Sequence, residues 1–325
     1  MPPPSDTITA TATRAATRRR VERCDVAVVG GGPAGLSAAL VLGRARLRVL
    51  VLDAGRPSNA VSPAIGGLLT HRRVDAAALR ADARAQLAPL PTVTVAPGEV
   101  RDAAPLPAGG IALTTADART LHARAVLLAQ GLRYEPPAVP GMDDLWGRSV
   151  LHCAFCDGWE VRDLQLAVLG RGADGARLAL NVRQWSPDVV LFTDGPAELD
   201  GRRGLLEDAG VRVREEPLAA LEGRGGQLER VRLADGSAEA RDALFVRPSI
   251  RRPDDLAPAL GCETTAAGLV ATDGHGRTTV PGVYAAGDVA TEAVRSIAIA
   301  VGSGARAAHS VVLDLVAQDR PPLTA

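Results

Sequence analysis

The sequence has 325 residues, of which 46% are hydrophobic, with 37 basic and 37 acidic side chains and a formal net charge of zero. This balance argues against nucleic acid or an acidic membrane surface as a partner. The sequence contains no lysine, so every basic residue is an arginine. No uninterrupted apolar run reaches the length that spans a bilayer, which predicts a soluble, cytoplasmic protein with room for two domains.

The N-terminal stretch, residues 1–20, is rich in proline, threonine, alanine and arginine and lacks an apolar signal-peptide core. We expect residues 1–22 to form a disordered tail rather than a secretory signal. An organellar transit peptide is the alternative, because the stretch is rich in arginine and poor in acids.

The first predicted element is a strand over residues 25–29, followed by a glycine-rich turn, a helix and a strand that ends at Asp53. Gly30, Gly32 and Gly35 form a G-x-G-x-x-G pattern, which lets the backbone approach a pyrophosphate at the start of the helix. Asp53 is placed to accept hydrogen bonds from a ribose. Strand, turn, helix, strand and acid together predict a dinucleotide site.

Cys153 and Cys156 are separated by two residues and lie between two glycine-rich patterns. A cysteine pair beside a dinucleotide site is typical of enzymes that move two electrons between sulfur and a redox cofactor. Zinc would need a second pair of ligands, so we predict no metal site. Cys24 and Cys262 stand alone and are expected to be small buried hydrophobic residues.

Two neighbours of the pair are candidate bases. His152 titrates near neutral pH and is the better base on intrinsic grounds, although it could be purely structural. Asp157 could equally be a helix-capping residue. Phe155 and Trp159 either line an apolar substrate pocket or belong to the core.

The same order of elements recurs after the pair. A strand over residues 164–169 leads into a second G-x-G-x-x-G over residues 170–175, followed by a helix and a strand over residues 189–192. The sequence therefore predicts two Rossmann-type units. Proline-rich linkers are expected near residues 136–141 and 248–253.

A third landmark is the run 282–289, a predicted strand that ends in Gly287 and Asp288 and precedes a helix over residues 295–316. An acid at such a strand end can bind a flavin ribityl hydroxyl. The start of the following helix can face the flavin pyrimidine ring.

In this order, the motifs VVGGGPAGLSAA, CAFCDG and GVYAAGDV resemble those of the low-molecular-weight thioredoxin reductases, over residues 24–318. The resemblance implies an α/β homodimer with two Rossmann-like, three-layer ββα nucleotide-binding domains. The FAD domain would be discontinuous, over residues 23–134 and 249–325. An inserted pyridine-nucleotide-type domain, residues 135–248, would carry the cysteine pair.

The resemblance also implies which residues bind FAD and which carry the redox chemistry. Cys153 and Cys156 would form the redox pair, with His152 and Asp157 beside it. The glutamine usual in the family at position 296 is replaced by a serine. The expected FAD-binding residues are Gly30, Gly32, Pro33, Ala34, Gly35, Asp53, Asn59, Val100, Gln130, Gly287, Asp288, Ser296 and Ile297.

One departure from the family concerns the second nucleotide site. Family members that use NADPH have an arginine-rich segment after the second Rossmann strand, whereas Asp194 stands there in this sequence. Asp194 would repel a 2′-phosphate and would suit the free 2′-hydroxyl of NADH, or no nucleotide. Arg202 and Arg203 follow at the wrong spacing, so the choice between NADH, NADPH and neither stays open.

A second departure lies in residues 56–73, which resemble instead the FAD-dependent dithiol oxidases of disulfide natural-product (antibiotic) biosynthesis, of the gliotoxin and holomycin type. That subgroup implies oxidation of a small-molecule dithiol through Cys153 and Cys156 to an intramolecular disulfide, with O₂ reduced to H₂O₂. The alternatives are an NAD(P)H-dependent thioredoxin reductase and a non-catalytic FAD redox sensor.

Overall fold

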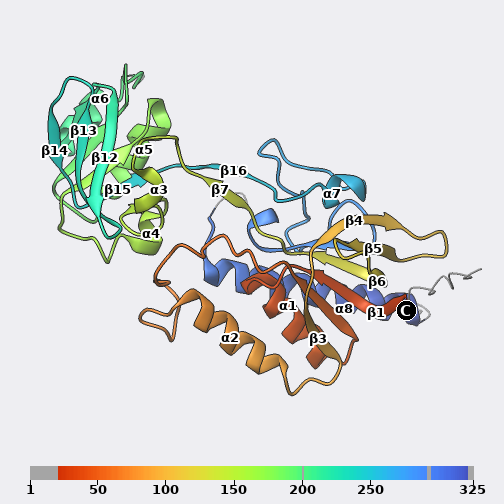
Figure 1. Ribbon diagram of the computed structural model, residues 1–325. Helices are drawn as coiled ribbons and strands as arrows, with labels where there is room; N and C mark the ends of the chain where they lie inside the picture. The colour runs from red at the N-terminus through yellow and green to blue at the C-terminus, as the bar shows by residue number, and fades with distance from the viewer. Residues whose placement is uncertain (1–20, 200, 291–293, 321–325) are drawn as a thin grey trace, which may run out of the picture.

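The computed structural model describes residues 21–199, 201–290 and 294–320, so residues 1–20 of the predicted tail lie outside it. Two α/β units lie side by side and are joined by two short extended segments (Figure 1). Each unit is built on a largely parallel sheet whose central strands are apolar and buried, as expected when helices or a second sheet cover both faces.

The first unit contains a sheet in the order β3-β2-β1-β6-β5-β4, with β17 also paired to β6. Its parallel strands are β1 (Glu22–Val29), β2 (Val49–Asp53), β3 (Val93–Pro97), β6 (Thr120–Leu128) and β17 (Val283–Ala285). Strands β4 (Val100–Pro105) and β5 (Ile111–Thr115) extend it as an antiparallel meander. Its helices are α1 (Pro33–Arg44), α2 (Ala76–Leu87), α7 (Leu256–Ala259), the 3₁₀ helix η1 (Gly287–Ala290) and α8 (Ile297–Asp319).

Helices α1 and α8 pack closely against each other. A Cβ on Gly304 would overlap the carbonyl of Ala34, and Ser37 donates a hydrogen bond to the Val301 carbonyl at 2.8 Å. Within the described ranges α8 is the one helix long and apolar enough to cross a bilayer by length and composition. Its contact with α1 identifies it as a core helix of the first unit.

The second unit contains the parallel sheet β11-β10-β9-β15-β8. Its strands are β8 (Val150–Leu151), β9 (Leu166–Leu169), β10 (Val189–Phe192), β11 (Val211–Arg214) and β15 (Ala243–Val246). Helices α5 (Gly172–Val182) and α6 (Arg203–Asp208) accompany it, with the short helices α3 (Met142–Leu145) and α4 (Ala154–Asp157). An antiparallel sheet of β12 (Leu218–Arg224), β13 (Gln227–Leu233) and β14 (Ala238–Ala240) completes the unit.

The chain leaves the first unit through β7 (Arg133–Glu135) and returns through β16 (Ser249–Arg251), and these two strands pair with each other. Because β17 and α8 then rejoin the first unit, that unit is discontinuous in sequence. The predicted α/β fold with two Rossmann-like units, one inserted into the other, is therefore confirmed. The exact boundaries at residues 134/135 and 248/249 stay a prediction.

Cys24 and Cys262 are free and buried in the core of the first unit, as predicted. Burial, with a smaller contribution from Asp25, raises the pKa of the Cys24 thiol to about 12. The prediction for the last helix was less accurate, since α8 begins at Ile297 after an N-cap at Ser296.

Candidate functional site

The first glycine-rich turn is shaped partly by the chain itself. Gly30 has a φ of 113°, and a Cβ on Gly30 would overlap the Ala129 carbonyl, while one on Gly35 would overlap the Gly30 carbonyl. Gly32 differs, because its φ of −80° suits any residue and a Cβ there would meet nothing within 4 Å. Gly32 is the N-cap of α1 and Pro33 is its first residue, so this open space lies at a helix N-terminus that favours phosphate.

The predicted ribose acid is at the end of β2. Asp53 accepts a hydrogen bond from the Gly55 amide at 2.9 Å and forms an ion pair with Arg84 of α2. Asn59 is half-buried, and its Oδ1 lies 3.5 Å from a guanidinium nitrogen of Arg80. The Val100 side chain is buried in the core at the start of β4, so only its backbone is available to a ligand.

The predicted flavin site around Gly287 and Asp288 contains residues that are far apart in the chain. Asp288 in η1 accepts a hydrogen bond from the Tyr134 hydroxyl at 3.0 Å. Burial raises the pKa of Asp288, against the opposing effects of the Tyr134 hydroxyl and Arg295. Ser296 Oγ caps α8 by accepting a hydrogen bond from the Ile299 amide at 3.2 Å. The Ile297 amide is at the first position of α8 and, like the first amides of any helix, has no intrahelical partner.

The donor and acceptor groups of this unit fit FAD. Gln130 Oε1 and Arg295 Nε are buried and have no hydrogen-bond partner among the residues that the structure describes, whereas Gln130 Nε2 is held by Asp254 at 3.1 Å. Buried polar atoms of this kind need a partner. Together with the open space at Gly32 and the Asp288 carboxylate, they suit the phosphates, ribityl chain and ring of a bound flavin. The individual FAD-binding roles stay predictions.

Cys153 and Cys156 form a disulfide at the start of α4. Cys153 is the N-cap of this helix, and its Sγ accepts a hydrogen bond from the Cys156 amide at 3.1 Å. An amide donor at this position stabilises negative charge on the Cys153 sulfur when the disulfide opens. Both residues are only half-buried, so a small thiol can approach them.

His152 lies between β8 and the disulfide, with two aromatic rings beside it. The ring centroids of Tyr134 and Trp146 are 4.9 and 5.8 Å from that of the imidazole. The imidazole keeps an accessible edge, yet protein atoms crowd around it. This desolvation, and then the positive charge of Arg295, lower the pKa of His152, which favours the neutral imidazole, the form that can accept a proton.

Asp157, the second candidate base, is the last residue of α4. Because Cys153 is the N-cap, Asp157 does not cap the start of this helix. Burial, and then the neighbouring carboxylate of Glu160, raise the pKa of Asp157 to about 6, against a lowering effect of Arg73. Its carboxylate can therefore also accept a proton near neutral pH. Neither assignment as the base goes beyond a prediction.

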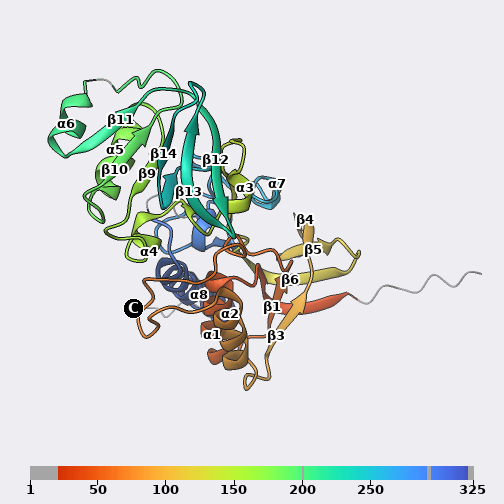
Figure 2. The same ribbon diagram turned by 60° about the vertical axis from the view of Figure 1, so that its left-hand side comes forward.

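The segment 56–73, which departs from the reductase pattern, lies against the redox helix. A Cβ on Gly66 would come within 2.7 Å of the Cys156 carbonyl oxygen, and Arg73 forms a 3.9 Å ion pair with Glu160. Figures 1 and 2 both place α4 on the side of the second unit that faces the N-terminal end of α8.

The aromatic residues of the redox segment are at the surface rather than in the core. Phe155 is 75% exposed and Trp159 66% exposed, so the alternative of core residues is wrong. Phe155 meets the ring of Trp185 edge-on at 5.3 Å, and the Arg162 guanidinium lies over Trp159. Exposed Leu69, from the segment 56–73, adds a further apolar side chain.

The second glycine-rich turn borders a groove of about 730 Å³, the place where a Rossmann unit binds its nucleotide. Arg171 crosses it, with a 2.6 Å hydrogen bond to the Thr193 carbonyl and a 3.5 Å ion pair with Asp194. The Asp194 carboxylate also accepts from the Leu218 amide at 2.8 Å. The polar groups expected to hold a ribose are therefore bonded to the chain itself.

Two further charged residues make this groove less suited to a nucleotide, one by its negative charge and the other because its positive charge is already paired. Asp174 places a carboxylate in the first turn of α5, where a pyrophosphate would lie, and pairs with Arg247 at 2.9 Å. Arg203, a possible phosphate ligand, is paired with Glu215. The residues present do not fit a bound NADPH.

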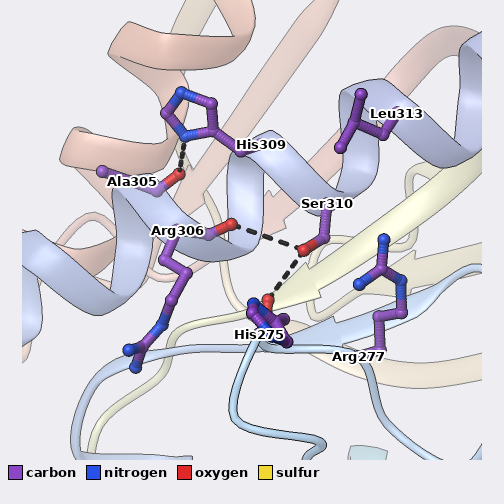
Figure 3. Close-up of a pocket in the computed structure, with 7 residues that line it drawn as sticks. All are labelled: His275, Arg277, Ala305, Arg306, His309, Ser310 and Leu313. Atoms are coloured by element: carbon purple, nitrogen blue, oxygen red, sulfur yellow. Dashed lines mark hydrogen bonds between the residues drawn. The ribbon is translucent and has the colours of Figure 1, made fainter.

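A second pocket, of about 540 Å³, lies on the outer side of α8 and does not involve the redox pair (Figure 3). Ser310 Oγ bonds to the His275 carbonyl at 2.9 Å, and the Arg277 guanidinium is held by Asp314 at 2.7 Å. In the described part of the chain no group of three or more His, Cys, Asp or Glu side chains gathers as a metal site would require.

Three residues of the site were not predicted from the sequence: Tyr134, Trp146 and Arg171. Tyr134 lies in a strand of three residues, and its partner Asp288 is 154 positions away. Arg171 occupies a variable position of the glycine pattern. Only the three-dimensional arrangement identifies these side chains.

Comparison with known proteins agrees with this geometry. Residues 24–304 match the family model described as pyridine nucleotide-disulphide oxidoreductase. A curated relative, thioredoxin reductase sirT of Leptosphaeria maculans, is 31% identical over 91% of this chain and 95% of its own length. Thioredoxin reductase tcpT of Claviceps purpurea is 30% identical over 81% and 86% of the two chains.

Solved structures give the same result. A putative thioredoxin reductase, TrxB, of Bacillus anthracis superimposes with a TM-score of 0.87 at 30% identity, covering 91% of this chain and all of the other. The structure of HlmI superimposes with a TM-score of 0.86 at 39% identity, covering 91% and 93%. The chain therefore belongs to the pyridine nucleotide-disulphide oxidoreductase family, as a thioredoxin reductase-like thiol/disulfide oxidoreductase whose cofactor is FAD.

Proposed function

We propose that the protein is an FAD-dependent dithiol oxidase that closes an intramolecular disulfide in a small-molecule dithiol and passes the electrons to O₂. The observation that carries the proposal is the groove beside the second glycine-rich turn. There the polar side chains that would hold a nicotinamide nucleotide are already bonded within the chain: Arg171 to the Thr193 carbonyl and Asp194, and Asp174 to Arg247. Electrons then have to enter from the thiol side.

The exposed surface beside the disulfide supports a small apolar substrate. Phe155, Trp159 and Leu69 present apolar area to solvent, and such area gains free energy when a ligand covers it. The formal net charge of zero gives no electrostatic preference for an acidic or basic partner.

In the first chemical step a substrate thiolate attacks Cys153 Sγ, the enzyme disulfide breaks, and Cys156 leaves as a thiolate. The proton of the attacking thiol passes to His152, whose lowered pKa favours the neutral, accepting form, or to Asp157, whose pKa is raised to about 6. The second substrate thiolate then attacks the substrate sulfur of the mixed disulfide. Cys153 leaves as a thiolate stabilised by the Cys156 amide, and the oxidised substrate is released.

Bound FAD would take the two electrons from the enzyme dithiol and deliver them, with two protons, to O₂ as H₂O₂. The balance is one dithiol and one O₂ consumed for one disulfide and one H₂O₂ formed. We further propose a cytoplasmic homodimer. The exposed apolar side chains of Leu313 and Val316 on α8 suit a second copy, and the free thiols of Cys24 and Cys262 suit a reducing compartment.

A thioredoxin reductase is the second candidate, favoured by the similarity to the thioredoxin reductases sirT and tcpT and by the Rossmann form of the second unit. Purified holoprotein is mixed anaerobically with dithiothreitol, NADH or NADPH while the flavin absorbance is recorded. Oxygen uptake with dithiothreitol is then measured with and without catalase.

Bleaching by dithiothreitol alone, with O₂ uptake halved by catalase, supports the oxidase. Rapid bleaching by NADH or NADPH without added dithiol identifies a reductase instead. If neither dithiothreitol nor NADH nor NADPH bleaches the flavin, the non-catalytic redox sensor is the remaining alternative. Cys153→Ser and Cys156→Ser serve as controls. If the protein is a dithiol oxidase, both variants should retain FAD and lose dithiol turnover.

A further inference from the structure

We propose that Tyr134 is a positioning residue of the active site, whose ring holds His152 beside the redox pair and whose hydroxyl orients Asp288 in the flavin site. This inference rests on the function proposed above, in which His152 is a candidate base. It adds a residue that no sequence motif identifies.

Tyr134 contacts one functional group from each unit. Its ring centroid lies 4.9 Å from that of the imidazole, with an angle of 36° between the ring planes. Its hydroxyl donates to Asp288 Oδ2 at 3.0 Å. Tyr134 itself belongs to β7, which crosses between the units, so the side chain lies where the base of the second unit meets the acid of the first.

The groups around the imidazole all lower the pKa of His152. Tyr134 and Trp146 cover part of the imidazole, which keeps an exposed edge, and Arg295 places a positive charge near it. This partial desolvation, and then the charge of Arg295, lower the pKa of His152. Burial raises the pKa of Asp288, and the hydrogen bond from the Tyr134 hydroxyl opposes this by favouring the ionised carboxylate. Loss of the ring would expose more of the imidazole to water and let its pKa rise towards the usual value.

Two variants separate the ring from the hydroxyl. Tyr134→Phe keeps the ring and removes the hydrogen bond, whereas Tyr134→Leu removes both. Tyr284→Phe is the matched control, since Tyr284 donates an equivalent hydrogen bond to Asp314 at 2.7 Å away from the redox pair. Thermal melts establish that each variant is folded.

The first measurement is the imidazole pKa of His152 in the oxidised protein, from the pH dependence of its C2-proton signal, which His152→Asn assigns. The second is the dissociation constant of FAD from the reconstituted apoprotein. We expect the imidazole pKa to be unchanged in Tyr134→Phe and raised in Tyr134→Leu. FAD should bind about five- to tenfold more weakly to both, because a hydrogen bond to a carboxylate is lost.

An unchanged imidazole pKa in Tyr134→Leu, or an unchanged FAD affinity in Tyr134→Phe, overturns the inference. So does an equal effect of Tyr284→Phe, which would show a general loss of stability. The pH dependence of flavin bleaching by dithiothreitol gives a third outcome. If its midpoint stays fixed in Tyr134→Leu while the imidazole pKa rises, Asp157 is the base and Tyr134 positions no catalytic group.

Failure of this inference and failure of the proposed oxidase function can be told apart, because neither the imidazole pKa nor FAD binding requires turnover. A protein that does not oxidise dithiols, yet shows both expected shifts, refutes the proposed function and leaves the contacts of Tyr134 with His152 and Asp288 established.

Discussion

Arg171 donates its Nε–H to the Thr193 carbonyl oxygen over 2.6 Å, so its side chain spans the gap between the ends of β9 and β10. In a Rossmann unit the ribose and pyrophosphate of a nucleotide occupy that gap. Arg171 therefore satisfies from within the chain the acceptors that a nucleotide would otherwise use. The groove keeps its volume, but polar groups at its edge are bonded to one another.

Opening this groove should restore some affinity for nucleotide. In the double variant Arg171→Ser, Asp174→Ser, the crossing guanidinium and the carboxylate at the start of α5 are removed together. We expect NADH to bind at least tenfold more tightly than to the wild type, about 1.4 kcal/mol, as measured by anaerobic fluorescence titration. The control is Arg224→Ser, Asp235→Ser in the antiparallel sheet of the same unit, which makes the same change in charge and composition outside the groove. Equal affinities in the two double variants would show that other groups close the groove.

The carboxylate of Asp157 should make stability depend on pH. Its pKa in the folded protein is about 6, above the ordinary value of 3.8, because of burial and then the charge of Glu160. Ionised Asp157 therefore costs folding free energy above pH 6, and the cost disappears as the pH falls below 3.8. Asp157→Asn should raise the free energy of unfolding at pH 8 by about 1–2 kcal/mol, a figure reduced for residual solvent screening, and should have little effect at pH 4.

Urea unfolding of the oxidised holoprotein at the two pH values measures this difference. Asp163→Asn, an exposed acid in the loop after α4, is the control and should have little effect at either pH. A gain for Asp157→Asn that is the same at pH 4 as at pH 8 would refute the electrostatic explanation.

The sequence predicted the parts of the site that local pattern determines. Gly30 and Gly35 are required by close backbone packing, and the two cysteines by their spacing at a helix start, so each leaves a signal within a few residues. Asp194 was recognised as unsuited to a 2′-phosphate from its position alone. Its actual partners, Arg171 and the Leu218 amide, could not be predicted, because the amide lies 24 residues away and no motif links them.

Exposure was the other property that the sequence did not determine. An aromatic residue after a turn can belong to the core or to the surface, and the outcome depends on which segment packs over it. Here the segment 56–73 contacts the backbone of α4 at Gly66 and leaves Phe155 and Trp159 uncovered. That contact joins two parts of the chain that are far apart in sequence.

Replacing Phe155 should impair substrate binding with little effect on stability. Because the side chain is 75% exposed in the free protein, Phe155→Ser removes little buried area on folding. We expect the KM for a small apolar dithiol to rise about tenfold with kcat changed less than twofold, since the ring would contact substrate and not the reacting sulfurs. Steady-state oxygen uptake measures both constants.

The control for Phe155→Ser is Leu205→Ser, an exposed apolar residue on α6 in the same unit. It should leave KM unchanged. A fall in kcat with constant KM in Phe155→Ser would indicate instead that the ring supports the geometry of the disulfide.

The contact between α1 and α8 should be needed for FAD retention, because it fixes the start of α1 where the phosphates would bind. A methyl group on Gly304 would overlap the Ala34 carbonyl, whereas one on Gly302, half a turn earlier on the same helix, would meet nothing within 4 Å. Gly304→Ala should therefore lower the free energy of unfolding by about 2–3 kcal/mol through overpacking. Gly302→Ala should raise it by about 0.5–1 kcal/mol through helix propensity.

Thermal melts and the flavin content of the purified proteins distinguish the two variants, which add the same methyl group to the same helix. Gly304→Ala should lose part of its FAD, since α8 can relieve the overlap only by displacing the turn that Gly32 and Ala34 belong to. Equal stability and equal flavin content in the two variants would mean that α8 can move away from α1 without disturbing the glycine-rich turn. In that case the packing of the helices and the binding of the cofactor would be independent properties of this unit.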